Sequence, residues 1–446
     1  MFSKILIANR GEIAVRVIRA CREMGISTVA VFSSADREAL HVSLADESYC
    51  IGGPLSKDSY LNSSAILATA LATGAEAIHP GYGFLSENAE FAALCQAQGL
   101  VFIGPSSEII AKMGDKDIAR QTMRAAGVPV IPGSDLIEDL AQARQEAQRI
   151  GFPLLIKARS GGGGRGIRLV NDLTELANAW SGAVAEATAA FADGAVYLEK
   201  YLQPVKHIET QILADQFGHV VCLGERDCST QRKNQKLIEE SPAALSDEIR
   251  QQMIEVSVQA AAAIGYEGVG TMEFLYDLAG HFYFMEMNTR LQVEHPITEM
   301  VTWIDLVKWQ IRAAAGVALD FSQSDIVPKG HAIECRINAE DPYQDFRPAG
   351  GRIEMLHIPG GPWVRFDTAI YQGYMIPPYY DSMIGKLIVY AKTRDEALRK
   401  MKAALGELII DGVVNNSAFQ ADILSSERFE DSSYTTDYLR EAGLSQ

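Results

Sequence analysis

The sequence predicts a multidomain protein of the α/β class, with α+β character in parts. Its 446 residues exceed what one hydrophobic core usually holds, so about two to four packed domains are expected. Short apolar strands alternate with amphipathic helices over about the first 110 residues. Later segments combine strand pairs, a glycine run and single helices, which predicts mixed β/α units.

The N-terminal alternation begins with an apolar strand at residues 4–8 and a helix at 11–24. Gly25 ends this helix, and residues 27–32 form a second strand. A strand, a helix and a strand within about 30 residues form a right-handed parallel unit. Further patterns at 77–79, 87–98 and 101–103 extend this unit to an open, doubly wound domain.

The first strand-to-helix turn argues against a nicotinamide cofactor. It reads Ala-Asn-Arg-Gly-Glu-Ile from Ala8 to Ile13 and has one glycine where a dinucleotide fingerprint has three. The carboxylate of Glu12 would also face a bound pyrophosphate. The turn is therefore interpreted as part of a structural α/β layer, and an oxidoreductase is disfavoured.

The rest of the chain divides into two further units. The expected domains are 1–114, which is doubly wound; 115–328, with a subdomain at about 131–203; and 329–446, which is mixed β/α. The elements expected in them are helices at 136–150, 247–264 and 394–408, and strands at 153–158, 167–170, 195–200, 208–213, 220–225, 271–276, 281–285, 330–337 and 353–357.

Composition limits the partners and the compartment. The net charge of −17 disfavours nucleic acid and anionic membranes, because each phosphate contact needs a local cation. No apolar run is long enough to cross a bilayer or to act as a signal peptide. The six cysteines are scattered and include no C-x-x-C pair, which indicates reduced thiols and a cytoplasmic protein.

The densest polar motif runs from Glu286 to Glu294 and follows the strand expected at 281–285. Side chains alternate faces along a strand, so Phe282, Phe284, Glu286 and Asn288 are expected on one face. The carboxylate and amide oxygens of Glu286 and Asn288 suit a hard cation such as Mg²⁺. A hairpin through 277–280 would place Glu273 beside them. The alternative is an exposed polar strand with ordinary salt bridges.

Two other segments predict anion binding. Four consecutive glycines at 161–164, with Lys157 before them, predict a flexible lid over nucleotide phosphates, although a plain hairpin loop remains an alternative. The cationic run at 231–236 predicts an anion pocket, or otherwise a solvated basic face. Arg336, in a later strand, could contribute to that pocket or form a structural ion pair. The segment from Glu199 to Leu202 could contact adenine through its backbone, or form a solvated edge strand.

Together these segments resemble the biotin carboxylase family over nearly the whole chain. The matching stretches are Ile7–Ala14, His79–Asn88, Met113–Lys116, the glycine run, Glu286–Pro296, Glu334–Glu340 and Pro377–Lys386. The resemblance implies an ATP-grasp fold with a mobile lid in the central domain. It also implies an ADP-forming ligase that makes carboxybiotin from ATP, bicarbonate and biotin through carboxyphosphate.

The resemblance implies a role for each matching residue. For ATP these are Lys116, Lys157, Gly163, Gly164, Glu199, Lys200, Tyr201, Leu202, His207, Gln231 and Leu275. For Mg²⁺ or Mn²⁺ they are Glu273, Glu286 and Asn288, and for bicarbonate they are Lys236, Arg290, Gln292 and Val293. Glu294 matches the general base, Arg336 the residue beside the biotin ureido oxygen, and Tyr82 part of the biotin pocket. Glu294, Arg290, Arg336 and Lys236 form the implied catalytic set.

The resemblance also implies partners. No biotinylated segment is recognised, because Met401-Lys402 lies inside an amphipathic helix, so the biotin carboxyl carrier protein and the carboxyltransferase subunits are expected to be separate chains. A homodimer is expected, as is a place in acetyl-CoA carboxylase and fatty-acid synthesis or in a related acyl-CoA carboxylase. Asn234 stands where many relatives have His, which leaves the final carboxyl acceptor open.

Two alternative functions are considered, and the second belongs to another class. A different ATP-grasp ligase that captures an acyl phosphate with an amine would share the metal and lid residues, but Glu294 and Arg336 argue against it. A non-catalytic nucleotide-binding regulator should lack one of the metal-binding groups, and all three are present.

Overall fold

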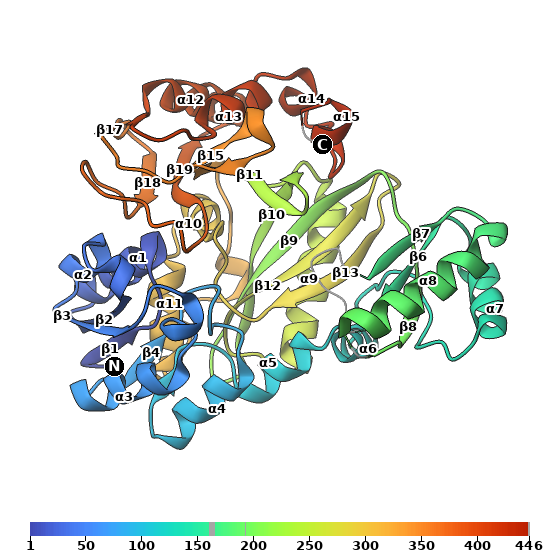
Figure 1. Ribbon diagram of the computed structural model, residues 1–446, viewed down its shortest axis with the longest axis horizontal. Coiled ribbons are helices and arrows are strands. Elements are labelled where there is room, and N and C mark those ends of the chain that lie inside the picture. The colour runs from blue at the N-terminus through green and yellow to red at the C-terminus, as the bar shows by residue number, and fades with distance from the viewer. Residues whose placement is uncertain (160–165, 192, 445–446) are drawn as a thin grey trace.

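The first unit of the fold is a parallel sheet. The computed structural model of the protein describes residues 1–159, 166–191 and 193–444. In this sheet the strand order is β3-β2-β1-β4-β5, and every neighbouring pair is parallel (Figure 1). The strands are β1 (Lys4–Ile7), β2 (Ser27–Ser33), β3 (Glu47–Gly52), β4 (Ala77–His79) and β5 (Val101–Phe102). The doubly wound N-terminal domain is confirmed.

Helices pack against this sheet because their apolar residues recur on one side. Ile13, Val17, Ile18 and Cys21 of the first helix are all buried, as the helical spacing predicts. The helices are α1 (Gly11–Glu23), α2 (Leu40–Leu44), α3 (Ser63–Thr73), α4 (Ala89–Ala97) and α5 (Ser107–Gly114).

A second sheet of eight strands forms the centre of the molecule. Its order is β13-β12-β9-β10-β11-β14-β19-β18, and all its neighbouring pairs are antiparallel. The strands are β9 (Val205–Ala214), β10 (Val220–Arg232), β11 (Gln235–Ser241), β12 (Gly268–Asp277), β13 (Phe282–Asn288), β14 (His331–Asn338), β18 (Val364–Thr368) and β19 (Met383–Ala391). The pairing of β11 with β14 continues the sheet across the expected boundary at 328/329, and the domain bounds stay a prediction.

Helices cover both faces of the large sheet. On β10, Glu225 is bonded by Arg250 of α9 (Asp247–Ala263), and its neighbour Arg226 bonds Thr298 of α10 (His295–Thr302). These two helices therefore lie on opposite faces. The remaining helices are α6 (Lys116–Ala125), α11 (Leu306–Ala314), α12 (Arg394–Glu407), α13 (Ser417–Leu424), α14 (Glu427–Glu430) and α15 (Tyr438–Glu441), and two small sheets pair β15 (Glu340–Asp341) with β16 (Arg347–Pro348) and β17 (Met355–His357) with β20 (Ile409–Asp411).

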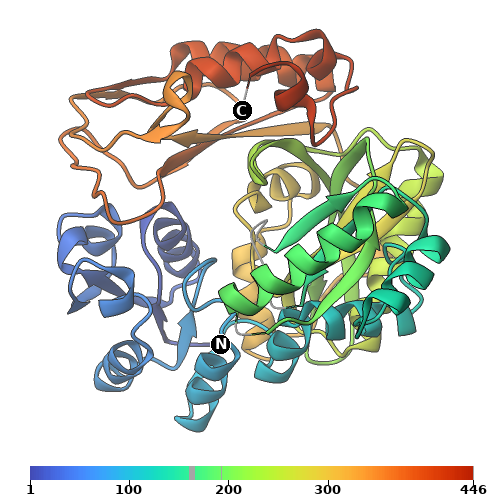
Figure 2. The ribbon, with the colours of Figure 1, turned by 45° about the vertical axis from the view of Figure 1, so that its right-hand side comes forward.

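A third, smaller unit has its own sheet and core; it lies to the right of the central sheet in Figure 1 and in front of that sheet in Figure 2. It corresponds to the predicted lid subdomain. Its strands, in the order β7-β6-β8, are β6 (Leu154–Ala158), β7 (Ile167–Val170) and β8 (Val196–Lys200), and its helices are α7 (Leu140–Ile150) and α8 (Leu173–Phe191). The predicted phosphate contacts of Gly163 and Gly164 lie outside the described residues.

One strand departs from the expected alternation. The pairing of β12 with β13 shifts register between Glu273 and Phe274, at a bulge opposite Met285. Glu286 and Asn288 still share a face, but Phe282 and Phe284 turn to the opposite face and pack in the core. The prediction that all four side chains share one face was therefore wrong for the two phenylalanines. Within the described residues, no helix is long and apolar enough to span a membrane.

Buried histidines predict a loss of stability in acid. Burial lowers the pKa of His41 from 6.5 to about 4 and that of His79 to about 3. Both pKa values lie below those of the unfolded chain, so the stabilisation is complete above pH 6.5 and is lost as the pH falls towards 4. Each should contribute roughly 3 kcal/mol to this loss by about pH 4.

Urea unfolding at a series of pH values tests this. The variant His41→Gln, if folded, should show a weaker pH dependence of the unfolding free energy than the wild type. His357→Gln, which replaces an exposed histidine, is the control and should match the wild type. Equal pH dependence in His41→Gln and the wild type would contradict the prediction.

Candidate active site

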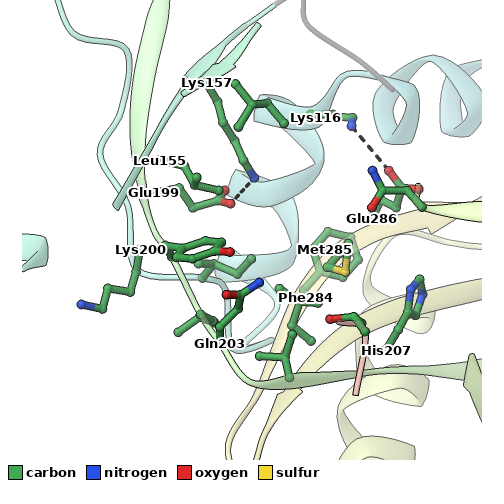
Figure 3. A pocket seen from close by; sticks show the side chains of 18 of the residues that line it. Lys116, Leu155, Lys157, Glu199, Lys200, Gln203, His207, Phe284, Met285 and Glu286 are labelled. Carbon is green, nitrogen blue, oxygen red and sulfur yellow. Dashed lines mark hydrogen bonds and ion pairs between the residues drawn. The ribbon is translucent and has the colours of Figure 1, made fainter. Parts of the chain in front are cut away.

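A cavity of about 290 Å³ lies between the lid subdomain and the central sheet (Figure 3). All the described residues predicted to contact ATP line it. They are Lys116, Lys157, Glu199, Lys200, Tyr201, Leu202, His207, Gln231 and Leu275. They come from α6, from three strands of the central sheet, from two strands of the lid subdomain and from the segment after β8, so this cavity depends on how these two units pack together.

Charged pairs occupy the walls of this cavity. Lys157 Nζ donates a hydrogen bond to Glu199 Oε1 across β6 and β8, and Lys116 Nζ lies 3.6 Å from Glu286 Oε2 (Figure 3). Lys200 Nζ instead turns away to the backbone carbonyl of Phe152, 2.7 Å distant. Lys157 and Lys116 therefore provide the cationic groups that a triphosphate needs, and Lys200 contributes chiefly through its backbone.

A second cavity, of about 310 Å³, adjoins the first and shares His207, Asn234 and Glu286 with it. Every residue predicted for the metal and for bicarbonate lines this second cavity. These are Lys236, Glu273, Glu286, Asn288, Arg290, Gln292 and Val293. Glu273 and Glu286 are directly opposite each other on paired strands, so their carboxylates share one face of the sheet.

Lys236, on β11, lies at the centre of the acidic groups. Its Nζ is 2.6 Å from Glu209 Oε2, 3.0 Å from Glu273 Oε1 and 2.7 Å from Glu294 Oε1. Burial would lower the pKa of Lys236, but these carboxylates raise it well above its usual value. The ammonium group is therefore charged, and it adds a positive group for a small anion to those of Arg290 and Arg336, which line the same cavity.

Glu294 is the N-cap residue of α10 and is almost completely buried. Arg336 Nη2 donates to its Oε2 at 3.0 Å, and Lys236 holds its Oε1. Burial would raise the pKa of Glu294, but the charges of Lys236 and Arg336 hold it well below its usual range. The carboxylate is thus ionised, which is the form that accepts a proton.

Gln292 and Arg290 are two further side chains predicted to bind bicarbonate, and both line the second cavity. Gln292 Nε2 donates to Glu273 Oε1 at 2.7 Å, and Arg290 Nη2 donates to Asn288 Oδ1 at 3.0 Å. Arg290 Nε also donates to Glu87 Oε2, 2.8 Å away, on the N-terminal domain. Arg290 therefore connects the N-terminal domain to the central sheet at the cavity.

A third cavity, of about 520 Å³, continues the row and shares Arg290, Val293 and Arg336 with the second. Tyr82 lines it, and the Tyr82 hydroxyl donates to Glu12 Oε1. Predicted biotin-pocket residues from two distant parts of the sequence, Tyr82 and Arg336, are thereby brought into one cavity. Glu12, whose carboxylate would oppose a pyrophosphate at the first strand-to-helix turn, is buried here.

Arg336, on β14, lies between two acids. Its Nε donates to Glu239 Oε1 at 2.6 Å, and its Nη2 reaches Glu294. Its Nη1 makes no hydrogen bond to the part of the chain that the structure describes. Glu239 is directly opposite Glu334 on the neighbouring strand, and burial raises the pKa of both carboxyls. Because two carboxylates buried opposite each other repel, one of the pair is expected to keep its proton, and the net negative charge beside Arg336 is then smaller.

The comparisons with known proteins agree along the whole chain. Family models match residues 1–110 (biotin carboxylase, N-terminal domain), 115–322 (carbamoyl-phosphate synthase L chain, ATP binding domain) and 334–441 (biotin carboxylase C-terminal domain). Biotin carboxylase 1 of Bacillus subtilis is 55% identical over 98% of both chains. The chain belongs to the biotin carboxylase family. The predicted family, fold class and enzyme class, an ATP-dependent ligase, are therefore confirmed.

Two solved structures of biotin carboxylases show the same fold. The biotin carboxylase domain dimer of the Hydrogenobacter thermophilus 2-oxoglutarate carboxylase, in complex with MgADP, ADP and bicarbonate, is 51% identical, with a TM-score of 0.93 over 99% of this chain and 98% of that one. The biotin carboxylase–β,γ-ATP complex from Campylobacter jejuni is 49% identical, with a TM-score of 0.94 over 99% of both chains.

Several residues that contact the predicted site residues were not predicted from the sequence, among them Glu209, Glu87 and Glu239. Glu209 shares one face of β9 with His207 and Gln211, and this run of polar side chains at alternate positions could have revealed it. Glu87 lies far from Arg290 in the sequence, and no local pattern links them. Glu239 follows an apolar pair on β11 and shows its role only through Arg336.

Asn234 has a structural explanation. With Lys233 it forms the two-residue loop between β10 and β11, and both residues have positive φ angles, 64° and 47°. Such hairpin loops favour Asn because its backbone tolerates the left-handed region. Asn234 also lines the first two cavities, so this loop residue lies where the two cavities adjoin.

The contact between Glu87 and Arg290 gives a testable prediction. Glu87→Gln should raise the KM for bicarbonate about three- to tenfold, because a charge-assisted contact that orients Arg290 is weakened. The carboxylate is exposed, so folding should be preserved. The matched control is Glu90→Gln, which alters an exposed acid on α4 and should leave the KM unchanged. An unchanged KM in Glu87→Gln would show that Arg290 needs no such support.

Proposed function

We propose that this chain makes carboxybiotin from ATP, bicarbonate and biotin carried on a separate protein, through carboxyphosphate. The observation that carries the proposal is the row of three cavities that share wall residues, from the nucleotide residues through the anion residues to Tyr82 and Arg336. A phosphoryl donor, a small anion and a third substrate can thus bind in sequence along one path.

The residues present fit a divalent metal ion. Glu273 and Glu286 face each other, and each now has a lysine ammonium beside it, Lys236 and Lys116 respectively. A divalent cation could take the place of these two ammonium groups and bind the carboxylate oxygens, with the amide oxygen of Asn288 as a further ligand. When bound, Mg²⁺ or Mn²⁺ would neutralise the phosphoryl oxygens of ATP. Glu273, Glu286 and Asn288 are the proposed ligands.

Bicarbonate is proposed to bind where Lys236, Arg290, Gln292 and the backbone at Val293 meet. Glu294 would take its proton, and the oxygen freed would attack the γ-phosphorus of ATP as ADP leaves. Lys236 contacts Glu294 in the structure. If the ammonium group moves to bicarbonate when that anion binds, Glu294 loses a positive neighbour, and its pKa rises as it is needed to take the proton. Carboxyphosphate then breaks down to CO₂ and phosphate.

Biotin is proposed to bind in the third cavity. The phosphate released from carboxyphosphate takes the proton of the ureido nitrogen, which then attacks CO₂. Negative charge develops on the ureido oxygen, and Arg336 Nη1, which makes no hydrogen bond to the described residues, can donate to it. Tyr82 lines the same cavity. The closed lid subdomain would exclude water from carboxyphosphate.

The partners proposed are a biotin carboxyl carrier protein, carboxyltransferase subunits and a second copy of this chain. A homodimer is supported by the dimer of the Hydrogenobacter thermophilus relative. The final acceptor stays open between acetyl-CoA, a longer acyl-CoA and a keto acid, because that same relative is part of a 2-oxoglutarate carboxylase. Copurification of the biotinylated carrier and transferase from the native host would identify it.

Phosphate release from ATP tests the proposed function. With Mg²⁺, release should depend on bicarbonate and be stimulated by free biotin, and labelled bicarbonate should appear in carboxybiotin. Release that needs an amine and ignores bicarbonate would instead indicate an ATP-grasp ligase that captures an acyl phosphate. No ATP turnover with any acceptor would indicate a regulator.

A further inference from the structure

A single buried arginine lies beneath the proposed bicarbonate site. Arg226, on β10, has none of its surface exposed and lines none of the three cavities. A guanidinium group has five N–H donors, and all five have acceptors here. Nε donates to Glu209 Oε1 at 2.6 Å, Nη1 to Gln211 Oε1 at 2.6 Å and to Thr298 Oγ1 at 2.9 Å, and Nη2 to Gln292 Oε1 at 2.9 Å and to Thr271 Oγ1 at 3.3 Å.

Arg226 fixes the orientation of the Gln292 amide. The carbonyl oxygen of Gln292 accepts from Arg226 below the cavity, so its NH₂ group faces Glu273 and the cavity. A flipped amide would point its NH₂ at a guanidinium that can only donate, and its oxygen at the carboxylate of Glu273. An anion needs donors, and only the observed orientation presents them.

Two further contacts extend this role to the charged groups of the site. Glu209 is held between Arg226 on one oxygen and Lys236 on the other, at 2.6 Å each. Thr298 belongs to α10, the helix whose N-cap residue is Glu294. Arg226 therefore holds the Gln292 amide directly, the Lys236 ammonium through Glu209 and, through Thr298, the helix that begins at Glu294.

We propose that Arg226 is a positioning residue that sets the affinity for bicarbonate by locking Gln292 and Glu209, without touching any substrate. The inference rests on the proposed bicarbonate site. It predicts a selective defect, because the nucleotide cavity has walls from the lid subdomain and α6 that Arg226 does not contact.

The test is the variant Arg226→Lys, which keeps a charge beside Glu209 but cannot reach all the other acceptors. The KM for bicarbonate should rise about tenfold or more, while the KM for ATP should stay within about twofold. The matched control is Arg250→Lys, whose arginine bonds Glu225 on the opposite face of the same strand at 2.7 Å. It should leave both KM values unchanged, although it also replaces a guanidinium group that bonds a buried carboxylate.

A second variant separates positioning from general damage to the fold. In a Gln292→Ala background, Arg226→Lys should raise the KM for bicarbonate by less than about threefold, because one of the groups it orients is already absent. Should Arg226→Lys fail to fold, Thr298→Val removes one acceptor without burying an unpaired charge and should raise the same KM by about threefold.

Failure of the positioning role and failure of the proposed function give different results. A folded Arg226→Lys protein with an unchanged KM for bicarbonate, equal rises for bicarbonate and ATP, or full additivity with Gln292→Ala would overturn the positioning role. An unchanged KM in Thr298→Val would do the same if Arg226→Lys does not fold. A wild-type protein without bicarbonate-dependent ATP turnover would instead overturn the proposed function.

Discussion

Replacement of Glu294 by glutamine is expected to reduce biotin carboxylation by about two to four orders of magnitude. Glutamine has nearly the same shape and keeps hydrogen-bonding atoms, but it cannot accept the proton of bicarbonate. In this chain the loss should be severe because Glu294 is ionised and buried between Lys236 and Arg336, and glutamine would deprive each of these cations of one of its carboxylate partners.

The defect should appear before biotin takes part. Because proton removal precedes attack on ATP, bicarbonate-dependent phosphate release should fall as far as carboxylation does. A control is Glu299→Gln, on the same helix α10, which breaks buried ion pairs to Arg16 and Arg365. That control should lower the melting temperature but not the turnover of the folded protein. Near-normal rates in Glu294→Gln would mean that another group is the base.

Replacement of Arg336 by methionine should lower carboxylation by about two to three orders of magnitude, as the loss of a preorganised donor to developing negative charge does. The reason lies in its geometry: Nε and Nη2 are fixed by Glu239 and Glu294, and this leaves Nη1 available to the ureido oxygen. Arg336→Lys keeps the positive charge but loses the planar set of N–H donors of the guanidinium group, so it should recover only part of the rate.

The two variants should differ in which step they impair. Arg336 is proposed to act on biotin, so phosphate release without biotin should fall much less than carboxylation in Arg336→Met. Parallel measurement of released phosphate and of carboxybiotin in the same samples distinguishes the steps. If both quantities fell by the same factor, Arg336 would act with Glu294 on bicarbonate and not on the ureido oxygen.

Much of the fold followed from local patterns, with limits that have physical causes. Helical spacing predicted α1 and α12 to within about one residue at each end, because buried positions recur with the helical period. The bulge at Met285 was not predictable, since a bulge changes which face a residue occupies without a change in composition. The strand expected at 353–357 is shortened to three residues, paired with β20 from a distant part of the chain.

The site shows the same division. Strand alternation predicted that Glu286 and Asn288 lie together. In the structure they share one face of the sheet, and Glu273 lies on that face too, directly across from Glu286 on the paired strand. Glu87 and Arg226 act through contacts that join segments far apart in sequence, so periodicity alone could not identify them. Their importance follows only from tertiary structure, which decides the partners of a buried charge.

The central claim is that two acids and an amide hold a divalent metal beside ATP, next to a site for bicarbonate. A crystal structure with Mg²⁺, a non-hydrolysable ATP analogue and bicarbonate tests it most directly. Oxygens of Glu273, Glu286 and Asn288 should lie about 2.0–2.6 Å from a bound cation. Bicarbonate should contact Lys236, Arg290 and Gln292. The nucleotide bound without any cation at these three side chains, or with bicarbonate elsewhere, would contradict the account.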